Sequence, residues 1–239
     1  MKTTTFMTGH WTDLIMRSYT IEPDVLVPFL PNDVELDLFN NKAVFSAVAF
    51  QFSKVKFFGI KVPFHQSFGE INFRVYVKSK IDGRKGVVFL REFAPKPLIA
   101  FIANKIYNEP FYYKSIQIRK EHNSESIYTQ YNFPGGILAV NASQEFMEPE
   151  IKSFDHFIID RYVAFVKNED LSSKVYLIQH KLWAFSKNTE VSEYGAVLDL
   201  LPPVFKRAKL LHTHFVNGSE VGVEIGFQQQ DFIKSPVIS

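Results

Sequence analysis

Polar and apolar residues alternate strictly through residues 70–77. The polar positions are Glu70, Asn72, Arg74 and Tyr76, and each residue between them is apolar. Because successive side chains of a strand point to opposite faces, this pattern predicts a strand with one polar and one apolar face. The polar face combines a carboxylate, an amide, a guanidinium and a phenol. Such a set lines a cavity as readily as it meets water, so both interpretations stay open.

The same kind of pattern predicts the elements on either side of this strand. We expect three helices: a short one near residues 24–30, one from Pro97 that ends before Pro110, and a brief one over 153–159 capped by Ser153. Two hairpins are expected, over 70–93 and 114–133. The other expected strands are a long strand or bent pair over 43–58, a short strand after Pro134-Gly135-Gly136, and strands over 174–185, 191–200 and 220–227. Strands dominate, and no βαβ rhythm is present. The predicted fold class is therefore α+β, a mostly antiparallel sheet or barrel with a few peripheral helices, in one domain over residues 1–239.

Composition narrows the classes of partner. The 27 basic and 25 acidic residues are mixed along the chain, so no nucleic acid is expected to bind. The chain has no cysteine, which excludes disulfides, thiolate nucleophiles and thiolate metal sites. Residues 1–10 contain no signal-peptide core, and no uncharged apolar run approaches the ~20 residues of a membrane span, so a cytoplasmic location is expected. The 25 Phe and 10 Tyr are typical of a wide interior or an apolar pocket.

Further charged residues lie next to apolar strand positions. Glu70 and Arg74 are separated by roughly 13 Å on one strand face, so either each has a cross-strand partner or both face something bound between them. Arg161 either supplies a cation to a carboxylate ligand or completes a structural ion pair. His180, on a predicted strand with Trp183 on the opposite face, is either an acid or base or a satisfied core histidine.

The sequence contains little that indicates a metal site or a nucleotide-binding site. His212 and His214 would share a face of an extended segment, but spacing places no third ligand beside them, so no metal site and no cofactor are predicted. The chain has no GxSxG elbow, phosphate loop, HExxH motif or dinucleotide fingerprint. The Pro134-Gly135-Gly136 run is too short to hold a nucleotide and is typical of a turn.

Several stretches carry a family resemblance. In chain order they are Tyr19 with Pro23, Leu26, Leu30 and Pro31, then Phe68-Gly69-Glu70-Ile71-Asn72-Phe73-Arg74-Val75-Tyr76-Val77, Gly86-Val87, Arg161-Tyr162 and His180-Lys181-Leu182-Trp183. Together they resemble the YqjF-like family of uncharacterised bacterial proteins, in the acetoacetate decarboxylase-like superfamily. The Glu-x-Asn-x-Arg element over residues 70–74 is the most specific part. The resemblance implies an acetoacetate decarboxylase-like β-barrel of antiparallel strands that encloses a cavity, with helices outside.

The resemblance also implies a missing reactive group. In the decarboxylases a lysine forms a Schiff base with the keto acid, and a second adjacent lysine depresses its pKa. This lysine pair follows a proline, and here Phe111 and Tyr112 stand in its place. Glu70 looks like the decarboxylase pocket glutamate, whereas Thr20 takes the likely place of an early arginine. Lys114 is an alternative nucleophile from a shifted register, although no neighbouring cation in the sequence would favour its neutral form.

The sequence therefore favours a cytoplasmic protein that binds a small organic ligand, such as a carboxylate, without Schiff-base chemistry. Its candidate ligand-binding residues are Glu70, Asn72, Arg74, Tyr76, Arg161 and His180. The alternative is a non-covalent lyase or isomerase that acts on a carbonyl compound with Glu70 or His180 as base. A third interpretation is an interaction module whose polar strand is an exposed edge, and a homo-oligomer is compatible with each.

Overall fold

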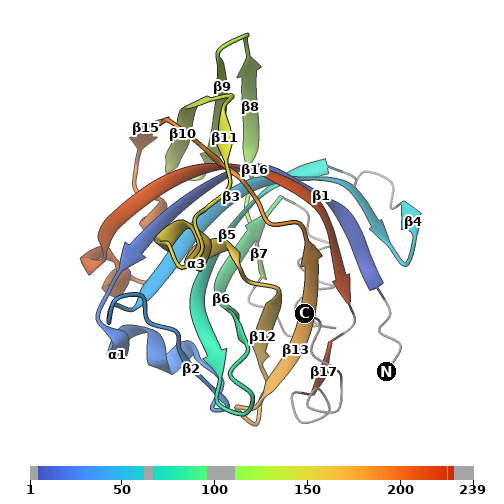
Figure 1. Ribbon diagram of the computed structural model, residues 1–239, viewed down its shortest axis with the longest axis vertical. Helices are drawn as coiled ribbons and strands as arrows, with labels where there is room; N and C mark the ends of the chain where they lie inside the picture. Colours follow the sequence, from blue (N-terminus) through green and yellow to red (C-terminus); the bar gives the residue numbers. More distant parts are fainter. Residues whose placement is uncertain (1–4, 62–66, 96–110, 225, 229–239) are drawn as a thin grey trace.

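Long, curved strands make up most of the computed structural model, which describes residues 5–61, 67–95, 111–224 and 226–228 (Figure 1). The strands are β1 (Thr5–Thr20), β2 (Val34–Leu36), β3 (Val44–Phe57), β4 (Ile60–Lys61), β5 (Ser67–Ser79), β6 (Lys85–Ala94), β7 (Phe111–Tyr113), β8 (Gln117–His122), β9 (Ser126–Phe133), β10 (Gly136–Ser143), β11 (Phe146–Met147), β12 (Val163–Lys167), β13 (Ser173–His180), β14 (Phe185–Ser186), β15 (Thr189–Tyr194), β16 (Lys209–Glu224) and β17 (Phe227–Gln228). The helical segments are α1 (Pro23–Leu26), α3 (Phe154–Ile159) and the 3-10 turns η1 (Val27–Phe29), η3 (Val197–Leu200) and η4 (Pro203–Arg207).

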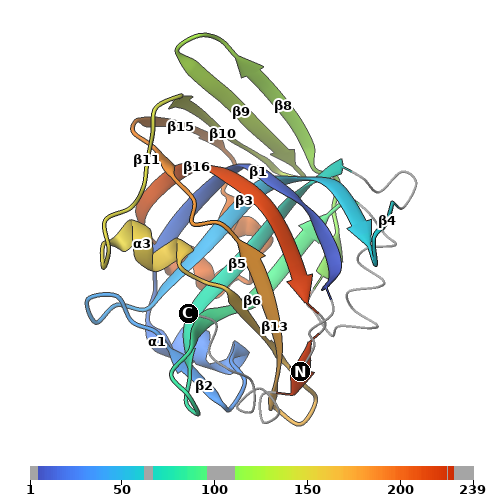
Figure 2. The same ribbon diagram turned by 45° about the vertical axis from the view of Figure 1, so that its right-hand side comes forward.

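The larger sheet follows the order β11-β14-β16-β1-β3-β5-β6-β12-β13-β17. Its pairs are antiparallel, apart from those of β6 with β12 and with β7. β13 also pairs with β16, so the pairings bring the two sides of this order together (Figure 2). A smaller antiparallel sheet, β15-β10-β9-β8, projects from one end. The predicted α+β class with mostly antiparallel strands is confirmed, whereas closure into a barrel stays a prediction.

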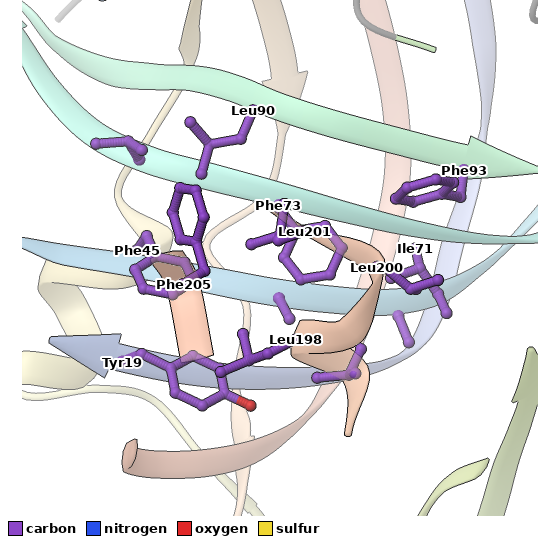
Figure 3. Close-up of a cluster of buried hydrophobic side chains, with 14 of the residues drawn as sticks. Tyr19, Phe45, Ile71, Phe73, Leu90, Phe93, Leu198, Leu200, Leu201 and Phe205 are labelled. Atoms are coloured by element: carbon purple, nitrogen blue, oxygen red, sulfur yellow. The ribbon is translucent and has the colours of Figure 1, made fainter. Parts of the chain in front are cut away.

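The two faces of the larger sheet pack against different partners. On the outer face, Ile71, Phe73 and Val75 of β5 join a core with η3, η4 and residues of the smaller sheet (Figure 3). On the inner face, Tyr76 of β5 belongs to a second core that includes Ile158 of α3. Because alternate residues of a strand face opposite sides, the apolar residues of β5 fill the outer core and its polar residues lie on the inner face, where Arg74 and Tyr76 contact α3.

Local sequence signals explain the elements around this strand. Gly83 has φ of 73°, which glycine adopts without a steric penalty, and it forms the predicted turn between β5 and β6. Ser153 accepts a hydrogen bond from the backbone N–H of His156 and caps α3, as predicted. The hairpin of β8 and β9 likewise confirms the prediction for residues 114–133.

Two predicted strands are shorter than the pattern indicated. The strand predicted over 174–185 ends at His180, and a separate two-residue strand begins at Phe185. The strand predicted over 191–200 ends at Tyr194, after which Gly195 with φ of 65° turns the chain into η3. The helix predicted from Pro97 lies outside the described residues. Within the described ranges, none of the helices has the length and apolar character needed to cross a bilayer.

Candidate functional site

The four polar residues of β5 lie on the inner face and are buried. Glu70, Asn72, Arg74 and Tyr76 retain 6%, 4%, 7% and 0% of their exposed surface. None of them faces bulk solvent, which excludes the interpretation of this strand as an exposed edge. A buried polar side chain is costly unless a partner satisfies it, so the contacts of each residue decide what the row can do.

Tyr76 ends a row of hydrogen-bonded hydroxyl groups that crosses β5, β3 and β1. Its Oη lies 2.6 Å from Ser46 Oγ on β3, and Ser46 Oγ lies 2.7 Å from Ser18 Oγ on β1. All three side chains are fully buried. A hydroxyl both donates and accepts, so this chain satisfies Tyr76 and fixes the position of its ring on the inner face.

Arg74 is a buried cation that makes few contacts. One guanidinium nitrogen donates to the backbone oxygen of Ile158 in α3 at 3.2 Å and lies 3.9 Å from Met16 Sδ. Its Nε is buried without a hydrogen-bond partner. In the described ranges, no carboxylate forms an ion pair with Arg74. A β-bulge in the pairing of β5 with β6 lies between Phe73 and Arg74, and bulges re-aim side chains next to functional sites.

Asn72 and Glu70 form the adjoining part of the row. Asn72 Nδ2 donates to Glu70 Oε1 at 3.5 Å, while the amide oxygen of Asn72 is buried without a hydrogen-bond partner. Glu92 of β6 is paired with Asn72 across the ladder and is 5% exposed. The inner face therefore combines acidic groups and an unsatisfied acceptor with the unsatisfied Nε of Arg74.

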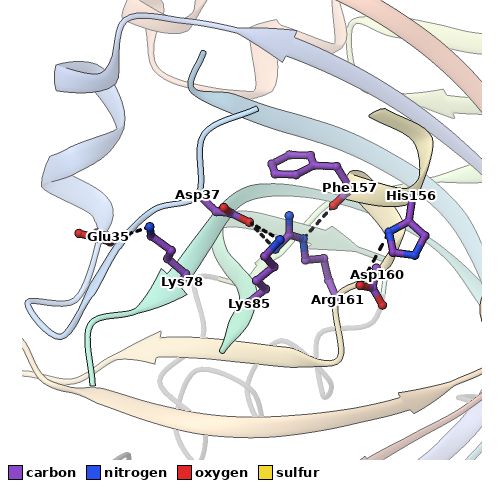
Figure 4. Close-up of polar contacts among 8 residues, drawn as sticks. All are labelled: Glu35, Asp37, Lys78, Lys85, His156, Phe157, Asp160 and Arg161. Carbon is purple, nitrogen blue, oxygen red and sulfur yellow. Dashed lines mark hydrogen bonds and ion pairs between the residues drawn. The ribbon is translucent and has the colours of Figure 1, made fainter. Parts of the chain in front are cut away.

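Arg161 has a partner inside the protein. Its Nη1 forms an ion pair with Asp37 Oδ2 at 2.8 Å, and its Nε donates to the backbone oxygen of Phe157 at 2.9 Å (Figure 4). The guanidinium also lies 5.4 Å from the centre of the Tyr76 ring. Burial lowers the pKa of Arg161, and the charge of Asp37 opposes this shift. The structure thus places Arg161 beside the row but engages it in an ion pair.

His180 lies at the end of β13, and its surroundings correct one expectation. Trp183 does not point to the opposite face of a continuing strand, because β13 ends at His180 and the indole stacks on the imidazole at 4.3 Å. The ring nitrogens of His180 lie 2.8 Å and 3.3 Å from the backbone oxygens of Lys181 and Arg161. Burial lowers the pKa of His180, those carbonyls raise it, and the charge of Arg74 lowers it further. His180 is therefore within electrostatic range of the row.

His212 and His214 share a face, as the sequence predicted, and their ring centres lie 4.2 Å apart. His214 Nε2 donates to Asp155 Oδ1 of α3 at 2.8 Å. No cluster of three or more metal-ligating side chains is found among the residues that the structure describes. The pair thus forms a histidine and aspartate contact that the sequence did not reveal.

The predicted positions of the lysine pair lie on β7. Tyr112 is 45% exposed, and its ring lies against Phe93 at 5.5 Å and under the guanidinium of Arg91 at 5.3 Å. Lys114 follows β7, and its backbone N–H donates to the oxygen of Ala94 at 3.0 Å. The side chain of Tyr112 thus lies toward the surface.

Sequence reasoning missed the residues that hold the row in place. These are Ser18, Ser46, Asp37, Met16 and the backbone oxygen of Ile158. Ser46 was a usable signal, because it is the polar residue within the otherwise apolar run 44–50 and Ser is not favoured at buried positions, whereas Ser18 beside Arg17 gave no such signal. Asp37 gave no such signal, since its ion pair with Arg161 joins distant parts of the chain.

Comparisons with known proteins agree with this architecture. Residues 8–199 match the DUF2071 family, described as an uncharacterized conserved protein. The uncharacterized protein YqjF of Bacillus subtilis (strain 168) is 25% identical over 215 residues, which cover 85% of this chain and 87% of YqjF. The resemblance to the YqjF-like family is thereby confirmed.

Solved structures show the same fold at low sequence identity. Acetoacetate decarboxylase of Legionella pneumophila matches with a TM-score of 0.61 and 13% identity, over 94% of this chain and 88% of that one. The enduracididine biosynthesis enzyme MppR, complexed with pyruvate, matches with a TM-score of 0.61 and 11% identity, over 96% and 92% of the two chains. An acetoacetate decarboxylase-like enzyme of Sphingomonas wittichii RW1 gives 0.60 and 12%, over 94% of each chain.

Proposed function

Because the chain belongs to the DUF2071 family of uncharacterized conserved proteins and has an acetoacetate decarboxylase-like fold, we propose that it binds a small organic carboxylate on its inner face. We infer that the strand pairings from β16 through β13 close a barrel around this ligand. The residues that bind it are the polar row of β5, with Arg74 at the carboxylate.

The observation that supports the proposal is the buried charge of Arg74, which forms no ion pair with any residue that the structure describes. The side chain is 7% exposed, its Nε has no hydrogen-bond partner, and its guanidinium is in contact with a neutral carbonyl. A buried charge without a counter-ion is strongly unfavourable, so an anionic ligand stabilises this arrangement. A guanidinium offers two parallel N–H donors, which match a carboxylate in bidentate geometry.

The neighbouring groups suit a ligand with polar atoms beyond its carboxylate. The free amide oxygen of Asn72 accepts a hydrogen bond, and Tyr76, fixed by Ser46, presents a rigid ring and hydroxyl. Glu70 accepts a hydrogen bond or a proton. Arg161 and His180 border this row without leaving their present partners. The pyruvate in the MppR complex is a small oxo acid and supports this choice of ligand class.

The proposal excludes covalent imine chemistry. Phe111 and Tyr112 occupy the positions that match the decarboxylase lysine pair, and Tyr112 lies toward the surface. Borohydride treatment of the protein with pyruvate or acetoacetate should therefore leave its mass unchanged. An adduct that maps to Lys114 or to any other lysine would contradict this part of the proposal.

The alternative is a lyase or isomerase that uses Glu70 or His180 as base. The lowered pKa of His180 keeps its ring neutral and able to accept a proton near neutral pH. Both of its nitrogens face backbone oxygens, however, which disfavours that role. Glu70→Gln separates the two functions, because retained binding with loss of turnover of a carbonyl compound would establish catalysis.

The decisive experiment is calorimetric titration with pyruvate and with its neutral counterpart pyruvamide. We expect the acid to bind more tightly, and Arg74→Gln to weaken its binding by about 10- to 150-fold, since hydrogen bonds to charged groups contribute about 1.5–3 kcal/mol. Arg119→Gln is the matched control, because Arg119 is an exposed arginine paired with Glu121 on β8. Arg74→Lys keeps the charge if Arg74→Gln fails to fold. Equal affinity of wild type and Arg74→Gln for pyruvate would refute the site.

The cellular location, the domain organisation and the partners of the protein are further parts of the proposal. We assign it to the cytoplasm, as one domain over residues 1–239, with no nucleic-acid or membrane partner. The mixed charges along the chain support this assignment. Cell fractionation tests the location, and light scattering after gel filtration tests whether the protein forms a homo-oligomer.

A further inference from the structure

A surface groove of 470 Å³ lies near the N-terminal end of α3, separate from Arg74. Its walls are the turn at residues 39–42, the start of α3 and the start of β16. His212 in this groove is paired with Ser18, Ser18 with Ser46, and Ser46 with Arg74 across successive strands. Three strand spacings place the groove about 14 Å from Arg74 along the sheet.

The turn fixes two side chains of the groove. The backbone groups of Phe39 and Lys42 exchange hydrogen bonds of 3.0 Å and 2.9 Å around Asn40 and Asn41. Both asparagines have positive φ, 48° and 61°, as a two-residue turn of type I′ requires, and asparagine tolerates this region better than other non-glycine residues. Residues that face each other across such a pair project to the same side, so the turn presents an aromatic ring beside a cation.

Asp155, at the start of α3, contributes a fixed anion to the groove. Asp155 accepts a hydrogen bond from His214 at 2.8 Å, and this bond lowers the pKa of Asp155, which therefore stays ionised at neutral pH. Its side chain is still 41% exposed. His214 thus fixes the orientation of the carboxylate and leaves part of it open to a ligand.

The groove therefore has both charges and an apolar lining. Lys42 forms no ion pair within the described ranges, so its charge is available. The ring of Phe39 packs edge-on to that of Phe154 at 5.2 Å, and Leu211 remains 40% exposed. Burial lowers the pKa of His212, so its ring adds no charge near neutral pH.

We propose that this groove binds a free α-amino acid with an apolar side chain. The ammonium group lies at Asp155, the carboxylate at Lys42, and the side chain packs against Phe39, Phe154 and Leu211. A ligand with a single charge would pair with either Asp155 or Lys42 and leave the other side chain solvated, so the two residues together favour a zwitterion. The site is distinct from the proposed carboxylate site, which has its own cation in Arg74.

The test is a titration of the full chain with L-leucine, in which two-dimensional NMR and calorimetry measure binding. Two analogues serve as probes of each charge, 4-methylpentanoate without the ammonium and 3-methylbutylamine without the carboxylate. We expect leucine to bind, and both analogues to bind at least about tenfold more weakly, as loss of a charge-assisted contact predicts. Lys42→Met should weaken leucine binding by a similar factor, whereas Lys61→Met, at an exposed lysine of β4, should not.

Three results would overturn the proposal. They are the absence of leucine binding at millimolar concentration, leucine binding that Lys42→Met leaves unchanged, and leucine binding that Arg74→Gln abolishes while Lys42→Met does not. The last result would place leucine at the inner site. Asp155→Asn is a second variant, and its circular dichroism must match wild type, because Asp155 also bonds to His214. Loss of pyruvate binding in Arg74→Gln with leucine binding retained would support both sites independently.

Discussion

Replacement of Asp37 by asparagine tests whether Arg161 is a structural or a ligand-binding residue. The Asp37 carboxylate lies 2.8 Å from Arg161 Nη1, and the two side chains are 12% and 2% exposed. Lys85 also forms an ion pair with Asp37, at 4.0 Å. Asp37→Asn keeps the shape of the side chain but removes the carboxylate that forms an ion pair with the buried guanidinium of Arg161.

The expected cost follows from this burial. Removal of one partner from a buried ion pair destabilises a protein by about 3–5 kcal/mol. The lower end applies here, because Arg161 keeps its hydrogen bond to the Phe157 oxygen and its contact with the Phe157 ring at 4.4 Å. For a chain of this size, each kcal/mol shifts the melting temperature by about 2–4 °C, so a loss of about 3 kcal/mol lowers it by roughly 6–12 °C.

Thermal and urea denaturation measure this loss, and a neighbouring pair provides the control. Glu35 and Lys78 form an ion pair on the adjacent strands β2 and β5, but their side chains are 50% and 42% exposed. Glu35→Gln should leave the melting temperature unchanged, because exposed ion pairs contribute little. A loss below about 1 kcal/mol in Asp37→Asn would refute a structural ion pair, and a gain in pyruvate affinity would show that Arg161 can hold the ligand.

Two further predictions concern packing and pH. Gly86→Ala should lower the free energy of unfolding in urea by about 1–3 kcal/mol, because its Cβ would lie 2.4 Å from the Val163 oxygen. Gly222→Ala is the control, since no atom would lie nearer than 3.5 Å to its Cβ. An equal loss in both variants would contradict this explanation. The pKa of His180 is lowered in the folded state, so its contribution to stability is present above about pH 6.5 and is lost as the pH falls through the folded pKa. The melting temperature of wild type should therefore fall more between about pH 7 and pH 5 than that of His180→Gln, and parallel curves would refute this assignment.

The sequence predicted those elements whose pattern depends on near neighbours. The alternation over residues 70–77 predicted β5 and its two faces, and Asp82-Gly83 predicted the following turn. The first long strand, β1, was not predicted, because Leu14, Ile15 and Met16 are all buried and such a run shows no alternation. The apolar residues of η3 resemble a strand for the same reason, and Gly195 was the available signal for its end.

Of the candidate site, the sequence predicted the polar residues that lie on the single strand β5. The strand pattern placed Glu70, Asn72 and Arg74 on one face but left open whether that face meets water or lines a cavity, and the structure shows the three residues buried. Their partners come from β1, β3 and α3, which are distant in sequence. Contacts such as Arg74 with the Ile158 oxygen depend on tertiary packing, which periodicity does not encode.

The pairing of β1 with β16 has a consequence for the order of events during synthesis on the ribosome. The two strands form a ladder from Thr5 to Thr20, yet Leu14 and its partner Val216 are separated by about 200 residues, a long-range contact of the kind that slows folding. β3 can dock on one edge of β1 early, while the other edge stays open until nearly all of these residues have been translated. An unpaired strand edge can pair with other chains, so the nascent protein exposes an aggregation-prone edge of β1 until β16 emerges.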